Sequence, residues 1–331
     1  MKKYDTAIIG GGASGLAAAV LALKKGKTVA VYEKENRVGK KLLRTGNGRC
    51  NLSNLNMDES HYFGNIKNTG EIISSFSPFD FFGELGLMLR HDNEGRVYPY
   101  SNSANSVLDA LRGFCLQEKY RGEYTEFCDT EITDLNKINA DEIKICTGGG
   151  AYLPGGEKVK TMPALCPIFV LEDIRSLRGV RFKCSVSTDG GQNPEFGEVQ
   201  FTDNALSGIC IFNQSIHYEN GMKITLDLCP EYSAKEIAKY PLAGIYPKML
   251  AMYMQKIGEN KYLTFTAKGL DKSKAQVTKG GFSDVNNSLQ SKRDSRISYL
   301  GEALDIIGKC GGYNLHFAFA SAYFNSLKLN S

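Results

Sequence analysis

The sequence lacks the spacing of a metal centre or a redox-active dithiol. Its nine cysteines form no Cys-x-x-Cys pair, and none of its four histidines stands at ligand spacing from a cysteine. These absences argue against the zinc-finger and thioredoxin-type classes, so we expect no metal site. We interpret the thiols as reduced and mostly buried, which is typical of a cytoplasmic protein.

The sequence also lacks a strong charge of one sign and a long apolar run. Lys and Arg number 40 and Asp and Glu 36, which gives a net charge of +4. This balance argues against a nucleic-acid partner. Lys2 and Lys3 precede an apolar stretch, as in a signal peptide, but the run over residues 13–23 is too short to cross a bilayer. We therefore expect a cytoplasmic protein without a membrane partner.

The length and composition indicate a soluble globular chain. Apolar residues make up 42% and charged residues 23% of the 331 residues. At about 150 residues per domain, this length predicts two domains or one domain with a large insertion. The 35 glycines are clustered rather than scattered, and the clusters carry most of the functional signal.

A strand–turn–helix–strand unit opens the chain. Apolar residues predict a buried strand over 4–9, an Ala- and Leu-rich helix ending near Lys25 and a second strand over 28–32. The turn before the helix has the pattern G-x-G-x-x-G, and the acidic Glu33 follows the second strand directly. Together these features are typical of a dinucleotide-binding fold.

Each residue of this pattern has a physical role. Gly10 permits the tight turn, Gly12 leaves space for a pyrophosphate at the helix N-terminus, and Gly15 allows the helix to pack closely on the strands. Glu33 can accept hydrogen bonds from both hydroxyls of the adenosine ribose. The pattern does not distinguish NAD from FAD.

A basic loop follows over residues 39–51. Its thirteen residues include three glycines, two asparagines and four basic side chains. Such a loop presents many backbone N–H groups, so it is suited to wrapping phosphates and the edge of a flavin.

These segments resemble one family of flavoproteins. GGGASGLAAA at 10–19 and GKKLLRTGNGRCNLSN at 39–54 are similar to the BaiN/RdsA family, which includes 3-dehydro-bile acid reductases, aminoacetone oxidase-like enzymes and other NAD(P)/FAD-dependent oxidoreductases. The resemblance covers residues 1–54 and 275–327 well and the middle in patches, such as 93–99 and 197–208. The stretches 121–140 and 150–167 are shorter than is usual in that family, which indicates a shortened member.

The resemblance implies an α/β fold of the two-dinucleotide-fold flavoprotein type. We expect a discontinuous Rossmann-like FAD-binding domain, residues 1–158 and 275–331, and an inserted β-rich substrate domain over 159–274. Within the insert, residues 179–187 and 223–228 are predicted strands. Residues 232–239 and 246–257 are predicted helices of a small lid.

The resemblance also implies which residues bind FAD. Gly311 and Gly312 would open the last helix, so that its N-terminus faces the flavin pyrimidine ring. Glu302 or Asp305 would bind ribityl hydroxyls or a phosphate-bound water. The full predicted set is Gly10, Gly12, Ala13, Ser14, Gly15, Glu33, Lys34, Lys41, Thr45, Gly46, Asn47, Arg49, Cys50, Asn51, Ile132, Thr147, Gly148, Gly149, Gly301, Glu302, Asp305, Gly311, Gly312, Tyr313 and Asn314.

The catalytic candidates are fewer. Arg49 and Arg96 are the best candidates for holding an anionic or carbonyl substrate, because a guanidinium offers two donors in a fork. Tyr313 could stack near the flavin or donate a proton, or simply pack. Cys310 has no partner cysteine nearby in sequence, and His316 is interpreted as a packed residue.

These observations predict an FAD-dependent oxidoreductase that acts on a small molecule. By resemblance, the reaction is reduction of an enone or oxidation of an amino-carbonyl compound, with NAD(P)H or oxygen as second partner. One alternative is a shortened paralogue that keeps FAD without turnover. Another is an NAD-dependent dehydrogenase that uses only the first unit of the fold, against which the C-terminal match argues.

Overall fold

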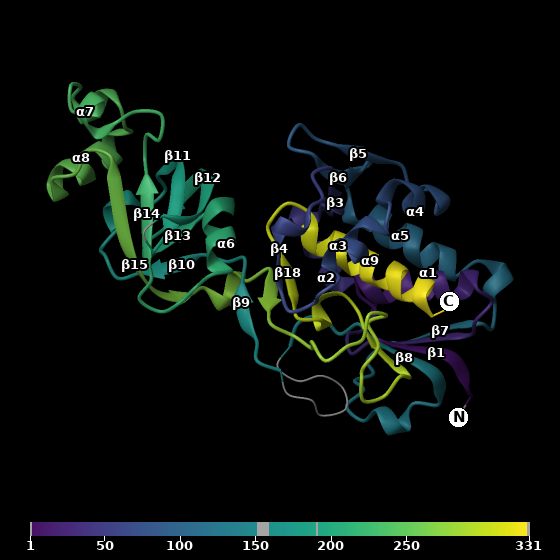
Figure 1. Cartoon of the computed structure of the whole chain (residues 1–331). Coiled ribbons are helices and arrows are strands. Elements are labelled where there is room, and N and C mark those ends of the chain that lie inside the picture. Colours follow the sequence, from purple (N-terminus) through teal and green to yellow (C-terminus); the bar gives the residue numbers. More distant parts are fainter. Residues whose placement is uncertain (1, 151–158, 190, 330–331) are drawn as a thin grey trace. The chain divides into compact units, whose positions relative to one another are not determined.

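The computed structural model describes residues 2–150, 159–189 and 191–329 and divides into two compact units (Figure 1). The first unit combines Met1–Met162 with Thr278–Ser331, and the inserted unit is Pro163–Val277. The predicted boundary at residue 158 lies outside the described residues. The chain therefore leaves the first unit once and returns to it once.

The first unit is built on a five-stranded parallel sheet in the order β17-β8-β1-β2-β7. Because β1 lies between β2 and β8, the chain leaves the centre of the sheet in both directions. Ligands of such sheets bind at the carboxyl ends of the strands, where the order reverses. The strands are β1 Tyr4–Ile9, β2 Val29–Tyr32, β7 Tyr124–Phe127, β8 Ala140–Ile145 and β17 Ile297–Tyr299.

Two helices from opposite ends of the sequence pack together in this unit. They are α1 (Ala13–Lys24) and α9 (Tyr313–Lys328), which lie side by side in Figure 1. Ten of the twelve α1 residues are buried, and five of its residues are alanine, so the helix is apolar on nearly all sides. A helix of this kind belongs in the interior of a domain rather than at its surface.

Shorter elements complete the first unit. Ser103 caps one of them, the helix α5 (Ala104–Cys115), since its Oγ accepts a hydrogen bond from the Asn105 N–H at 3.3 Å. The remaining elements are α2 Lys40–Arg44, β3 Ser53–Asn54, β4 Tyr62–Gly64, α3 Thr69–Ser74, α4 Pro78–Glu84, β5 Leu89–His91, β6 Arg96–Pro99 and β18 Ile306–Gly308, with β9 Met162–Ala164 and β16 Val277–Lys279 at the unit boundary.

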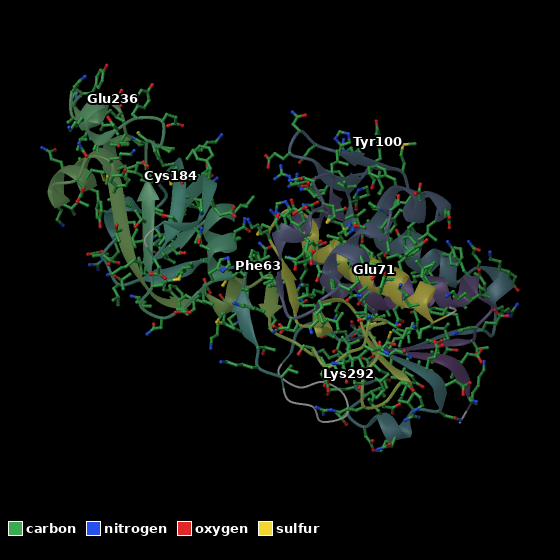
Figure 2. The ribbon with its side chains drawn as sticks, viewed as in Figure 1. Phe63, Glu71, Tyr100, Cys184, Glu236 and Lys292 are labelled. Carbon is green, nitrogen blue, oxygen red and sulfur yellow. The ribbon has the colours of Figure 1, made fainter. Side chains whose placement is uncertain are left out.

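The inserted unit is a closed six-stranded barrel in the order β10-β13-β12-β11-β14-β15. Burial alternates along its strands, so one face of each strand fills the barrel. Cys184 of β11, labelled in Figure 2, is one of these buried residues. The strands are β10 Ile168–Val170, β11 Arg181–Thr188, β12 Gln192–Phe201, β13 Ala205–Ser207, β14 Lys223–Asp227 and β15 Tyr262–Leu270.

Three helices accompany the barrel. α6 (Ile209–Ser215) packs on β12, whereas α7 (Ala234–Ile237) and α8 (Lys248–Ile257) lie in the connection between β14 and β15. The predicted helix over 232–239 is wrong in extent: a capping box of Ser233 and Glu236 starts it, but the chain turns towards Pro241 after one turn.

The predicted fold class is confirmed: a Rossmann-like α/β domain is interrupted by a β-rich insert with a small helical part. Among the described residues, no helix is both long enough and apolar enough to cross a membrane.

Candidate functional site

The glycine turn after β1 lies at the carboxyl edge of the sheet. Gly10 has φ +105°, and a Cβ placed on it would stand 2.4 Å from the Cys146 carbonyl oxygen. A Cβ on Gly15 would stand 1.9 Å from the Gly10 carbonyl oxygen. The close approach of β1, β8 and α1 therefore requires glycine at both positions.

Gly12 differs from these two glycines, because the fold itself does not require it. It is the N-cap of α1 with φ −85°, and no atom lies within 4 Å of the place where its Cβ would be. The missing side chain thus leaves open space at the N-terminus of a twelve-residue helix. This space and the adjoining backbone N–H groups fit the pyrophosphate of a dinucleotide.

Glu33 connects the end of β2 to the glycine turn. Its Oε2 accepts the Gly11 N–H at 2.8 Å, and its Oε1 accepts the Glu35 N–H at 3.0 Å. Each carboxylate oxygen retains further acceptor capacity, so the side chain can hold the turn and also receive ribose hydroxyls.

Replacement of Glu33 by Gln is expected to weaken FAD binding at least tenfold. The amide keeps the size of the side chain but loses charge-assisted hydrogen bonds, each worth about 1.5–3 kcal/mol. FAD titration of the apoprotein measures the effect. Glu35→Gln is the matched control, because the Glu35 carboxylate pairs with Lys40 and only the backbone N–H of Glu35 bonds to Glu33. Equal losses of affinity in both variants would contradict the role of Glu33.

Glu302 forms a second anchor at this edge. Its Oε2 is 2.5 Å from Lys41 Nζ on α2, and its Oε1 accepts the Thr278 N–H at 2.7 Å. A Cβ on Gly149 would stand 2.7 Å from Glu302 Oε1. The structure thus brings together Lys41, Glu302 and the turn after β8, which are far apart in the sequence.

Part of the basic loop is helical. It begins with the helix α2 and continues as a tight turn over Thr45–Gly48. Gly46, Asn47 and Gly48 all adopt positive φ, and so does Cys50. Burial raises the pKa of the Cys50 thiol to about 12, so this cysteine packs rather than reacts.

The N-terminus of α9 is held by this same loop. With its amide nitrogen facing the Ser53 and Val97 carbonyls, Asn51 accepts the Gly312 N–H at 3.2 Å. A Cβ on Gly312, whose φ is +102°, would stand 2.3 Å from the Ser53 carbonyl oxygen. The prediction that the glycine pair opens the last helix is confirmed.

The three catalytic candidates lie in different surroundings. The Arg49 guanidinium is exposed and stands 5.3 Å from the centre of the Tyr98 ring. Arg96 pairs with Asp92 at 2.8 Å and with Glu94 at 3.0 Å. Tyr313 is buried and its ring packs on neighbouring aromatic rings. Arg49 is therefore the most accessible of the three, and the catalytic roles stay predictions.

Other predicted cofactor residues spread along the same edge. Asn314 links the start of α9 to β18, because its side chain accepts the Gly308 N–H at 2.9 Å and donates to the Gly308 carbonyl at 2.7 Å. Asp305 accepts a hydrogen bond from the Asn65 amide. Ser14 is buried beside Gly301, on which a Cβ would stand 2.9 Å from the Ser14 Oγ.

The rest of the predicted set includes exposed and packed residues. Lys34 and Thr147 are exposed, and Ile132 is partly buried against the core. Thr45 donates from its hydroxyl to the Leu42 carbonyl at 2.6 Å. Three further predicted residues lie where helices and strands begin or end: Ala13 is the first residue of α1, Gly148 follows β8 and Gly311 precedes α9.

The interpretation of His316 as a packed residue is confirmed. Its Nδ1 lies 2.8 Å from Ser53 Oγ and its Nε2 lies 3.0 Å from the Ile73 carbonyl oxygen. The carbonyl can only accept, so Nε2 carries the proton and Nδ1 accepts from the serine. Burial lowers the pKa of His316, which keeps the ring neutral. Within the described residues, no cluster of His, Cys, Asp and Glu could hold a metal.

Comparison with known proteins decides the family. Residues 4–327 match the HI0933-like protein Rossmann domain. The chain belongs to the HI0933-like family. The predicted resemblance is thereby confirmed, because the relatives below include the reductase type named from the sequence.

Two characterised relatives cover nearly the whole chain. The 3-dehydro-bile acid delta(4,6)-reductase of Clostridium scindens is 30% identical over 397 residues, with 96% of each chain covered. The ribosomal RNA dihydrouridine synthase of Haemophilus influenzae is 24% identical over 405 residues, with full coverage of both. Both alignments are longer than the 331 residues of this chain, which agrees with the prediction of a shortened member.

Among solved structures, the 3-ketosteroid delta1-dehydrogenase of Sterolibacterium denitrificans is similar in fold, with a TM-score of 0.49, 11% identity and 99% of each chain covered. The predicted enzyme class, an oxidoreductase, agrees with the named reductase relative. The expectation that nucleic acid plays no part is not supported, because another relative is named for its action on ribosomal RNA.

Proposed function

We propose that this protein is an FAD-dependent reductase that saturates a carbon–carbon double bond conjugated to a carbonyl group. The observation that carries the proposal is the glycine turn, in which Gly12 leaves open space at the N-terminus of α1 although the fold does not require glycine there. When bound, FAD supplies hydride transfer, which no side chain can perform.

The residues of the first unit have separate roles in this proposal. The N-terminus of α1 binds the pyrophosphate, and Glu33 binds the adenosine ribose. Lys41 and Glu302 fix the turn after β8 beside the cofactor, and Asn51 holds the start of α9. The guanidinium of Arg49 is available for a carbonyl oxygen. The assignment of residues 163–277 as the substrate unit belongs to the same proposal.

The names of the two relatives support this choice of reaction. A delta(4,6)-reductase of a 3-dehydro-bile acid removes double bonds conjugated to a ketone, and a dihydrouridine synthase removes the uracil double bond conjugated to a ring carbonyl. The substrates differ greatly, but the bond that is saturated is of the same kind. We therefore prefer reduction over the alternative of amine oxidation, with NADH or NADPH as the source of electrons.

A spectroscopic experiment tests the proposal. The purified protein is expected to carry a yellow chromophore that is released on denaturation and that NADH or NADPH bleaches under anaerobic conditions. Addition of a 3-oxo-Δ4 steroid, or of a ribosomal RNA transcript containing uridine, should restore the absorbance. The two additions distinguish a small-molecule substrate from RNA. If dithionite bleaches the flavin but neither NADH nor NADPH does, the alternative holds, and the protein binds flavin without turnover.

A further inference from the structure

A small pocket lies beside the C-terminal half of α1, whereas the glycine turn precedes the N-terminus of this helix. It has about 280 Å³ of empty space, part of which is open to solvent, so it is smaller than a typical cofactor site. Its titratable groups are Lys25 and Lys27 after α1, and Glu142 and Lys144 on β8. All four belong to the first unit, and the proposed function assigns a role to none of them.

The amine of Lys144 is the buried member of this group. Its side chain is only 6% exposed, and its Nζ lies 3.8 Å from an oxygen of Glu142. The amine also donates a hydrogen bond to Asn325 Oδ1 on α9 at 2.5 Å. A neutral amine has two N–H bonds and a lone pair, so this hydrogen bond occupies one N–H and leaves the lone pair for a reaction.

The charges of the four groups do not balance. Lys27 Nζ lies 2.6 Å from the other Glu142 oxygen, and Lys25 donates to the Ser326 carbonyl. With Lys144 protonated, three positive charges stand against one negative charge, which leaves a net charge of +2 among the four. Both Lys25 and Lys27 repel a positive charge on Lys144. A negative charge at Lys144 would instead make the group neutral.

Burial makes Lys144 more nucleophilic than an ordinary lysine, because it lowers the pKa of Lys144 to about 8. The positive charges after α1 act in the same direction, whereas Glu142 and Cys146 oppose them. About one-tenth of the molecules therefore hold the neutral amine at pH 7, roughly 300 times the fraction for an unperturbed lysine. The neutral form is the one that attacks an electrophile.

Apolar side chains line the pocket beside these charges. Ala18 and Ala22 come from α1 and Ala322 comes from α9. Their methyl groups narrow the pocket and offer no hydrogen bonds, so the electrophile that fits is small and uncharged. Carbon dioxide meets these requirements, because it is linear, has three heavy atoms and leaves water without the cost of desolvating an ion.

We propose that Lys144 reacts with carbon dioxide to form a carbamate. The lone pair of the neutral Nζ attacks the carbon atom, an N–C bond forms, and one pair of C=O electrons moves to oxygen. The nitrogen then loses one proton to Glu142, which passes it to water. The reaction needs no oxidant or reductant, and the remaining N–H still donates to Asn325.

The carbamate removes the charge imbalance of the pocket. It carries one negative charge, so two ammonium groups stand with two anionic groups and the net charge of the four is zero. Its oxygens can accept hydrogen bonds from the ammonium groups of Lys25 and Lys27. Because Lys144 lies on β8 and its partner Asn325 lies on α9, the product should hold α9 more firmly on the sheet.

Trapping of the carbamate by ethylation tests the proposal. The full-length protein is equilibrated with sodium bicarbonate at about pH 8, near the pKa of Lys144, treated with triethyloxonium ion and digested for peptide mass spectrometry. Ethylation prevents the loss of carbon dioxide, so an ethoxycarbonyl group is expected on Lys144. In carbonate-free buffer this label should be absent.

Lys25→Met is expected to lower the labelled fraction about threefold, as for loss of one partly exposed ionic partner. The variant keeps the Lys144 amine but removes one of the two positive charges that stabilise the carbamate. Lys24→Met is the matched control, because Lys24 pairs with Glu84 and does not line the pocket. It should be labelled to the same extent as the wild type.

Bicarbonate is also expected to raise the midpoint of urea denaturation of the wild type, relative to chloride at the same pH and ionic strength. The physical reason is that a group bound only by the folded protein stabilises it. Lys144→Met should show no such rise. An equal rise in this variant would mean that the ion acts without the carbamate, which would contradict the proposed hold on α9.

The wild-type protein alone can overturn the assignment. If no label appears on Lys144 in bicarbonate, or if the label appears on Lys25 or Lys27 instead, Lys144 is not the site. Neither result bears on the proposed function, because the flavin takes no part in this reaction.

Discussion

Gly12→Val is expected to lower FAD affinity at least a hundredfold while the fold persists. The valine side chain would occupy the open space at the N-terminus of α1, where the pyrophosphate is proposed to bind. The backbone tolerates a side chain here, since no atom lies within 4 Å of the Cβ position and φ is an ordinary −85°. The apoprotein should lose only about 1 kcal/mol of stability, from the poorer N-cap.

Gly15→Ala, three residues away, is expected to show the opposite pattern, a larger loss of apoprotein stability and a smaller loss of FAD affinity. Its Cβ would stand 1.9 Å from the Gly10 carbonyl oxygen, so α1 or β1 must shift, which costs about 1–3 kcal/mol or more. Urea denaturation of the two apoproteins and FAD titration of each give the comparison. If Gly12→Val bound FAD as tightly as wild type, the glycine turn could not be the pyrophosphate site.

The second large expected effect is a pH dependence of stability that arises from Lys144. This lysine is buried near the end of β8, with its Nζ 2.5 Å from Asn325 Oδ1 on α9 and 3.8 Å from Glu142. Burial lowers the pKa of Lys144 to about 8, and the nearby Glu142 only partly opposes this. Asn325 in turn donates to the Ser288 carbonyl and to Ser298 Oγ, at 2.7 and 3.1 Å.

The stability of the wild type should rise relative to Lys144→Met between pH 7 and 9.5. In this range the folded protein releases the Lys144 proton near pH 8, whereas the unfolded chain holds it until about pH 10.4. The unfolded state therefore binds more protons, and stability increases with pH. The lowered pKa corresponds to a relative gain of about 2 kcal/mol over this range.

Urea denaturation at a series of pH values measures this difference. Comparison with the variant cancels the titration of the buried thiols, which acts in the opposite direction because burial raises the pKa of groups such as Cys146 to about 12. Lys27→Met, at a neighbouring half-buried lysine, is the matched control. Parallel pH curves for wild type and Lys144→Met would show that the buried lysine is not protonated differently on folding.

The local parts of the fold could be predicted from the sequence. The strand over 4–9, the helix after the glycine turn and the acid after β2 are set by apolar spacing and by glycine sterics within some thirty residues. The barrel strands near 179–187 and 223–228 follow from alternation. In each case the signal and the element occupy the same short stretch of chain.

The contacts that complete the candidate site could not be predicted in this way. Lys41 meets Glu302, Asn51 meets Gly312, and Ser53 meets His316, all across more than 250 residues. No local pattern encodes such pairs, because they depend on how α9 packs beside α1. The ring contact of His61 with Tyr313 could not be predicted for the same reason, because nothing near either residue in the sequence indicates it.

The packing of α9 on α1 also determines when the first unit can be completed during synthesis. The glycine turn leaves the ribosome well before Glu302, Gly312 and the residues of α9, because about 290 residues separate them in the sequence. Chains are synthesised at roughly 5–20 residues per second, so the first βαβ unit waits on the order of 15–60 s for its partner helix. The N-terminal segments and the barrel must therefore remain soluble without the finished site, and a nascent chain that ends before α9 lacks the helix against which α1 is buried.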